Sequence, residues 1–194
     1  MRKLLAALGI LLAAVAAALI VLSYSNSAVP ILMYHNIGDG GPARVHAVSP
    51  ETFRAQVEFL KRNGFSVISL DEFIRASASA KLLPYKCVVI TFDDGYENNY
   101  QHAYPVLREA GFPATLFIPA DFINQPGYIT AAQANEMAAS KIAVGAHGKT
   151  HAYLTSLTPE KLHDEVQVAR ERLEAVTGRP VRLFCYPLGE HDEQ

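Results

Sequence analysis

Two adjacent carboxylates, Asp93 and Asp94, follow the short apolar run CVVITF and precede Gly95. At the end of a buried strand, two neighbouring carboxylates repel each other and lose hydration, which is unfavourable unless a cation or a proton compensates the charge. The same residues are also typical of a turn that opens a helix, because Asp-Gly is a common turn dipeptide. The pair alone therefore leaves two interpretations open, a functional site or an ordinary turn.

Two histidines, His147 and His151, lie four residues apart directly after the apolar run IAVGA. On a helical turn, side chains at i and i+4 share one face, so the two imidazoles could bind one metal ion. An isolated pair with this spacing is often incidental, but here it follows a predicted strand in a chain that also carries the Asp pair. Two histidines and one carboxylate leave coordination positions open for water and substrate, as a catalytic zinc site requires.

A third cluster, FCYPLG at 184–189, ends the last apolar run of the chain. By itself it predicts a strand followed by a Pro-Gly turn. A stiff turn can also direct a backbone N–H toward an oxyanion that develops during a reaction.

Apolar runs with strand character alternate with helical patterns along the chain. Strands are predicted at 29–35, 65–70, 87–92, 114–119, 142–146 and 181–186, and helices at 49–64, 71–79, 98–110, 130–140 and 158–177. The last helix carries an apolar face of Leu162, Val166, Ala169, Leu173 and Val176. This alternation predicts parallel β/α units with right-handed crossovers. The three polar clusters then fall at the carboxyl ends of strands, where β/α folds form their active sites.

The N-terminus has the pattern of an export signal. Arg2 and Lys3 precede Leu4 to Leu22, a run without charged or polar side chains. As a helix this run would reach about 28 Å, close to the hydrocarbon thickness of about 30 Å. Its length favours an uncleaved anchor over a cleaved signal, although the small residues at 25–28 would permit cleavage. We expect residues 1–28 to be a signal peptide or anchor, with Met1 in the cytoplasm. A single extracytoplasmic domain at 29–194 would then be tethered to the cell membrane, or secreted after cleavage.

Composition excludes several other classes. The formal net charge is −2 and no basic cluster occurs, so no nucleic-acid partner is expected. A serine esterase is rejected because the chain has no G-x-S-x-G motif. Cys87 and Cys185 have no metal-site spacing, and buried free thiols are favoured over a disulfide.

The segments TFDDG, HGKTH and FCYPLG, in this order, resemble the polysaccharide deacetylase family with the NodB-homology domain. The resemblance covers about residues 29–194, and VPILMYHNI is similar to the opening of the branch that acts on poly-N-acetylglucosamine. It implies an α/β fold, a distorted (β/α) barrel. It also implies that Asp94, His147 and His151 bind a divalent metal, Zn²⁺ above all.

The resemblance also implies roles for three further residues. Asp93 would be the general base, and the backbone N–H of Leu188 would donate to the oxyanion. His35 would line the pocket and is the upstream candidate for the general acid, although it could equally be a hydrogen-bonded histidine at a strand end. Many relatives carry an arginine at the position of Cys185.

The later family motifs, an Asp-Trp segment and a Leu-x-His, have no counterpart, and the chain contains no Trp. We therefore expect a barrel that is incomplete at its C-terminus. The expected function is metal-dependent hydrolytic deacetylation of an N-acetylated polysaccharide that contains N-acetylglucosamine. The alternative from another class is a catalytically impaired fragment that acts as a glycan-binding module at the cell surface.

Overall fold

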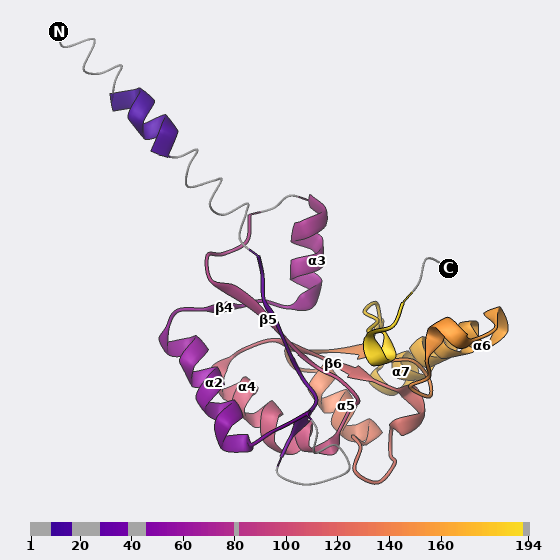
Figure 1. Cartoon of the computed structure of the whole chain (residues 1–194). Helices are drawn as coiled ribbons and strands as arrows, with labels where there is room; N and C mark the ends of the chain where they lie inside the picture. Colours follow the sequence, from indigo (N-terminus) through magenta and orange to yellow (C-terminus); the bar gives the residue numbers. More distant parts are fainter. Residues whose placement is uncertain (1–8, 17–27, 39–45, 80–81, 192–194) are drawn as a thin grey trace.

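The computed structural model describes residues 9–16, 28–38, 46–79 and 82–191. Its centre is a five-stranded parallel sheet in the order β1-β5-β6-β7, with β4 paired to the start of β5 (Figure 1). The strands are β1 (Ile31–Tyr34), β4 (Ser66–Val67), β5 (Cys87–Phe92), β6 (Ala114–Ile118) and β7 (Ile142–Ala146). A second, short parallel pair is formed by β2 (Asn36–Ile37) and β3 (Ala47–Val48). The predicted parallel α/β architecture is confirmed.

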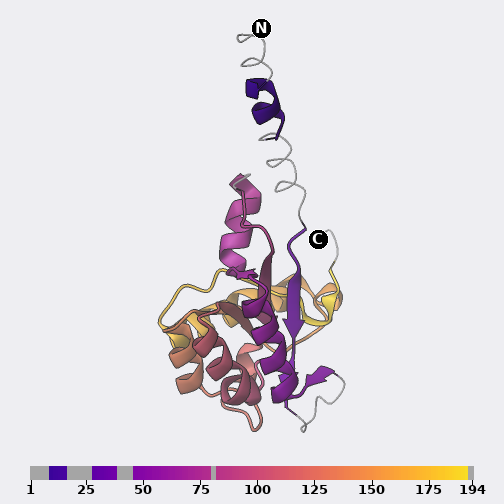
Figure 2. The same cartoon turned by 90° about the vertical axis from the view of Figure 1, so that its left-hand side faces the viewer.

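Helices connect these strands and cover the sheet. The α-helices after the first strand are α2 (Pro50–Arg62), α3 (Leu70–Ser79), α4 (Tyr104–Ala110), α5 (Ala131–Ala138), α6 (Pro159–His163) and α7 (Ala169–Thr177). Two π-helical segments, η2 (Asn99–Ala103) and η5 (Asp164–Val168), continue into α4 and α7, and the short 3-10 turns are η3 (Ala120–Phe122), η4 (Leu154–Ser156) and η6 (Pro187–Gly189). In Figure 2, α2, α4 and α5 gather on one side of β1.

Helix α2 shows why the local sequence signals were informative. The Ser49 hydroxyl accepts a hydrogen bond from the backbone N–H of Thr52, so the predicted N-cap is present. Phe53, Val57 and Leu60 then recur on one face, and all three are buried against the sheet.

A cluster of three aromatic rings joins α2 to the carboxyl ends of two strands. The rings of Tyr34 in β1 and Phe92 in β5 stack with their centroids 5.5 Å apart. Phe53 meets Tyr34 edge-on at 5.1 Å and Phe92 at 5.7 Å. Since His35 and Asp93 follow these strand residues directly, the ring cluster fixes the backbone from which both candidate site residues project.

The helical segment at 159–177 departs from its predicted face. Val166 is 39% exposed, whereas Glu165 beside it is buried. The prediction assumed α-helical spacing throughout, but residues 164–168 form the wider π-helical segment η5, which turns the following side chains relative to the preceding ones. The predicted apolar face is therefore wrong at Val166, while Ala169 and Leu173 are buried as expected.

The predicted last strand is also shorter than expected. Within 181–186 the structure has one bridge, in which Phe184 pairs in parallel with Ala146 of β7. Through the described residues, the sheet stays open between β1 and this bridge. The finer expectation of a distorted barrel remains a prediction.

The predicted membrane segment, Leu4 to Leu22, is described only at 9–16, which is helical. Its other positions, and residues 25–27 of the alternative cleavage region, lie outside the described residues. Among those the structure does describe, no helix has the length and apolar character needed to span a bilayer. The anchor and the domain boundary at residue 28 therefore stay predictions.

We expect Phe53→Ala to lower the free energy of unfolding by about 3–5 kcal/mol, because it leaves a cavity between two strands and α2. Phe59→Ala is the matched control, since Phe59 lies on the same helix but is 54% exposed, and it should cost less than about 1 kcal/mol. Urea unfolding followed by circular dichroism measures both. Equal losses in the two variants would contradict the role of the ring cluster.

Candidate metal centre

Three side chains from two strand ends converge on one point. Asp94 follows β5, while His147 and His151 follow β7. The Oδ1 atom of Asp94 lies 3.2 Å from Nε2 of His151 and 3.5 Å from Nε2 of His147. One ligand atom from each residue lies within 4.8 Å of the others. Two nitrogens with one oxygen suit zinc chemically, and small side-chain rotations would bring all three within the usual bond length of about 2.0–2.2 Å of one centre.

The two histidines do not converge by helical spacing. Residues 147–151 form a loop in which Gly148 has φ 75° and His151 has φ 63°. The positive φ favours glycine at position 148, and a Cβ atom there would lie 2.9 Å from Oε2 of Glu165 and displace that carboxylate. The expectation of a helical turn is therefore wrong, and the loop conformation brings the imidazoles together instead.

Glu165 holds this loop, and the sequence analysis missed it. Its carboxylate, buried under the loop, accepts hydrogen bonds from the backbone N–H groups of Lys149 and Thr150 at 2.7 and 2.9 Å. It accepts a third from the Thr150 hydroxyl at 2.6 Å. Three donors stabilise a charge that would otherwise be costly to bury. An acidic residue within a helical pattern gave no sequence signal, since most such residues are solvated.

The Asp pair is separated by backbone conformation. Asp94 has φ 69° and Gly95 has φ 68°, the left-handed region that non-glycine residues rarely adopt. A residue held in this region costs on the order of 1–3 kcal/mol and is found preferentially at functional sites. The sharp turn directs Asp94 toward the two histidines, whereas Asp93 remains 4% exposed with different neighbours. The alternative of an ordinary surface turn does not account for this burial.

His147 is oriented by a main-chain carbonyl. Its Nδ1 lies 2.9 Å from the carbonyl oxygen of Cys185, so the Nδ1–H donates there and Nε2 faces Asp94. Metal-binding histidines commonly donate their second ring N–H in this way. Burial alone would lower the pKa of His147, but its hydrogen bonds with Asp94 and Cys185 raise that pKa to about 10. A cation that binds Nε2 must therefore displace a proton.

The charge of Asp94 is compensated by the same contacts. Burial alone would raise the pKa of its carboxyl group. The hydrogen bonds and positive charge of His147 and His151 outweigh burial and hold the pKa well below its ordinary value. Asp94 is thus a carboxylate under all ordinary conditions, as a metal ligand must be.

Asp93 has the surroundings of a base. Its Oδ2 lies 3.8 Å from the thiol of Cys185, and its buried Oδ1 has no hydrogen-bond partner among the described residues. Burial raises the pKa of this carboxyl group, and the nearby His147 and His35 oppose the shift. A buried, weakly solvated carboxylate beside a cavity is a candidate proton acceptor.

The weak thiol donor of Cys185 lies where the resemblance predicted an arginine. Cys185 is half-buried rather than buried, and both cysteines are free.

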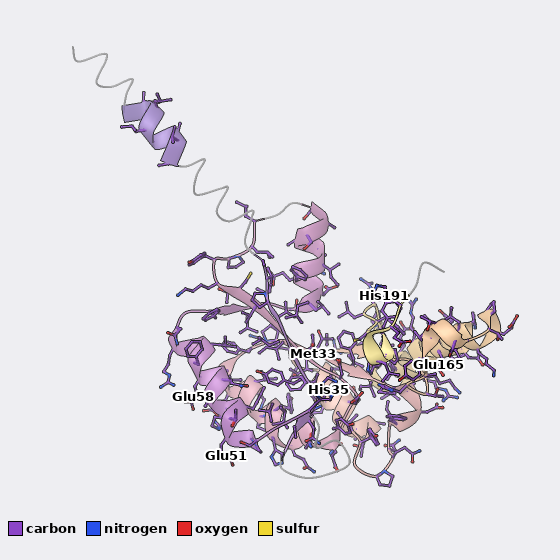
Figure 3. The ribbon with its side chains drawn as sticks, in the orientation of Figure 1. Met33, His35, Glu51, Glu58, Glu165 and His191 are labelled. Atoms are coloured by element: carbon purple, nitrogen blue, oxygen red, sulfur yellow. The ribbon has the colours of Figure 1, made fainter. Side chains whose placement is uncertain are left out.

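A cavity of about 740 Å³ joins these residues. Its lining includes both aspartates and both histidines of the cluster, together with Met33, His35, His46, Cys185, Tyr186 and Leu188. Figure 3 labels Met33 and His35, which lie close to each other in the middle of the view. Leu188 lies on the cavity wall, and its φ of 62° falls in the left-handed region. A backbone N–H at a cavity wall can donate to an oxyanion. The sequence analysis missed His46, because no apolar run or motif surrounds it.

Comparisons with known proteins agree with this geometry. A profile of the polysaccharide deacetylase family matches residues 81–194. YxkH of Bacillus subtilis (strain 168), whose name places it among the polysaccharide deacetylases, is 34% identical over 85% of this chain and 58% of its own length. The poly-beta-1,6-N-acetyl-D-glucosamine N-deacetylase of Escherichia coli (strain K12) is 31% identical over 49% of this chain.

A similar solved structure is the Streptococcus pyogenes deacetylase PplD in complex with acetate. It has a TM-score of 0.79 and 26% identity, over 85% of this chain and 76% of that one. The chain spans 58% of the length of YxkH and 14% of that of the E. coli protein.

We expect Glu165→Ala to weaken Zn²⁺ binding by about 10–100-fold, because the loop that carries both histidines loses its anchor. The unpaired donors should also cost about 1–3 kcal/mol of stability. Glu171→Ala is the control, since Glu171 is exposed on α7 and accepts one hydrogen bond from Gln167. Isothermal titration calorimetry measures the affinity. Unchanged Zn²⁺ affinity in Glu165→Ala would contradict the anchoring role.

Zn²⁺ affinity should depend on pH. The metal-free protein holds the His147 proton up to a pKa of about 10, so lowering the pH strengthens the competing proton. Between about pH 7 and 9 the affinity should rise roughly tenfold per pH unit, with about one proton released per ion bound. Calorimetry in buffers of different ionisation enthalpy counts the protons. A flat pH dependence would show that His147 carries no proton to be displaced over this range, contrary to its raised pKa.

Proposed function

The chain belongs to the polysaccharide deacetylase family, and we propose on that basis that it removes acetyl groups hydrolytically from an N-acetylated polysaccharide. The observation that carries the proposal is the convergence of Asp94, His147 and His151 beside the buried Asp93 in one cavity. The family assignment supplies the reaction class, and the geometry supplies a group for each step.

The first requirement is an electrophilic centre. A divalent cation held by Asp94, His147 and His151, Zn²⁺ above all, would polarise the acetyl carbonyl and lower the pKa of a nearby water. Asp94 stays ionised, as a ligand must, and His147 directs Nε2 toward the cluster, where the cation would displace the imidazole proton.

Asp93 then accepts the proton of the attacking water. The Asp93 carboxylate lies on the wall of the cavity, and the burial that raises its pKa makes it a stronger base than a solvated aspartate. The Cys185 thiol makes a long contact of 3.8 Å with Oδ2, and this weak donor leaves the carboxylate able to accept a proton.

The remaining two steps concern the oxyanion and the leaving amine. The backbone N–H of Leu188, which lies on the cavity wall, donates to the carbonyl oxygen as negative charge develops there. His35 lines the same cavity and protonates the departing amine. Without that proton the amine is a poor leaving group, so the tetrahedral species would revert to the amide. A positioned general acid typically contributes about 10²–10⁴-fold to such a step.

The substrate class follows from the relatives and the cavity. The E. coli relative is named for poly-beta-1,6-N-acetyl-D-glucosamine, which supports an N-acetylglucosamine-containing polymer here. The cavity, at about 740 Å³, falls within the usual range of about 300–1,000 Å³ for ligand sites. A glycan-binding module is not favoured, because binding alone would not need a buried carboxylate with a free oxygen.

Such a polymer belongs to the cell surface, in keeping with the predicted export signal. We therefore propose that residues 1–28 are a signal peptide or membrane anchor that leaves the domain outside the cell. We also propose that the parallel sheet is part of a distorted (β/α) barrel, as the family resemblance implies.

We expect Asp93→Asn to lower acetate release from N-acetylglucosamine oligomers by at least about 100-fold, because the proton acceptor is lost. Bound metal, measured by mass spectrometry, should stay near one per chain. Asp164→Asn is the control, since its side chain is 64% exposed. Loss of metal from Asp93→Asn would reverse the roles of the two aspartates. A wild-type chain that binds metal and glycan but releases no acetate would establish the binding module instead.

A further inference from the structure

We propose that His46 is a positioning residue, which holds the imidazole of His35 in the orientation that the leaving amine requires. This inference rests on the proposed function, in which His35 supplies a proton. The sequence around His46 carries no motif, and the assignment comes from strand register, a ring contact and the shared cavity.

The register of β2 and β3 sets the two histidines opposite each other. Asn36 pairs with Ala47 and Ile37 with Val48 in a parallel ladder. One step back along both strands brings His35 beside His46. Side chains that share a register position lie on the same face of a sheet. The ring centroids are accordingly 5.0 Å apart, with an angle of 37° between the planes.

The backbone of β2 is firmly fixed. Asn36 and Ile37 are buried at 1% and 0% exposure. The backbone N–H of Ile37 donates to the side-chain oxygen of Asn98 at 3.2 Å, and the amide of Asn98 donates to Asn36 at 2.5 Å. On the other side, the backbone N–H of Asp93 donates to the carbonyl of Tyr34 at 2.9 Å. The main chain of His35 is therefore held between Asp93 and the β2–β3 pair.

The side chain of His35 has no comparable restraint. Within the described residues, no hydrogen bond reaches its imidazole, and its ring contact is with His46. A side chain at a strand end can otherwise exchange among staggered rotamers. Reactions that depend on alignment lose as much as about 100-fold when a group is misplaced by about 1 Å. A flat ring against His35 narrows that freedom without taking its proton-donating atoms out of the cavity.

Both rings line the cavity that contains Asp93 and the metal cluster. His46 is more exposed than His35, and its ring borders the cavity beside the His35 ring. The two histidines thus form a unit in which one ring faces the reacting atoms and the other limits its rotation.

The test compares His46→Ala with His46→Phe, which keeps a flat ring. Two substrates are used, an N-acetylglucosamine oligomer and 4-nitrophenyl acetate, whose leaving group departs without protonation. For the oligomer, His46→Ala should lower kcat by about tenfold with KM within about twofold, and His46→Phe should recover most of the loss. Hydrolysis of the ester should be unchanged in both variants.

The contrary outcomes are distinct. An unchanged kcat for the oligomer in His46→Ala, equal losses for oligomer and ester, or a change in KM alone would each overturn the positioning role. A further arm does not depend on activity: nuclear magnetic resonance of ring-labelled histidine, with His35 assigned by His35→Gln. His46→Ala should shift or broaden the His35 ring signals, and His46→Phe should do so less. If the wild-type protein were inactive on both substrates, the proposed function would be refuted. The resonance measurement would still show whether His46 restrains the His35 ring.

Discussion

The arrangement depends on the placement of two negative charges at the end of one buried strand. Asp93 and Asp94 are neighbours in sequence, and both lie largely out of water. The left-handed turn at Asp94 sends the two carboxylates to different partners, one to a pair of imidazoles and one to a thiol and an open cavity. The imidazoles compensate the charge of Asp94, which suits it to bind a metal ion. The charge of Asp93 has no comparable partner, which suits it to act as a base.

Sequence periodicity located the strands that carry the site. The bounds of β5 and β7 were predicted as observed, since each is a short apolar run that ends at a polar cluster. The rule that parallel strands meet at one edge predicted that the Asp pair and the two histidines would lie close together. The choice of Asp94 as the third ligand came from the family resemblance.

What escaped prediction depends on backbone geometry and long-range register. A hydrophobic pattern does not reveal the loop conformation of Gly148 and His151. It also does not reveal the π-helical segment in which Glu165 is buried. His46 enters the site through pairing of two-residue strands, which are too short to be recognised by alternation. The contacts of Glu165 and His46 join residues that are distant along the chain. The loop at Gly148 and His151 adopts a conformation that no local sequence pattern specifies.

The bond that orients His147 ends on the main-chain oxygen of residue 185 and involves no side-chain atom. Every amino acid supplies that oxygen, so evolutionary drift at this position leaves the imidazole aligned. The side chain at 185 then becomes a separately adjustable element that faces Asp93. A thiol at this position leaves Asp93 without a charged donor, whereas a guanidinium would supply one, and either side chain keeps the carbonyl oxygen that orients His147. The side chain at position 185 can therefore change the properties of the base without disturbing the metal ligand His147.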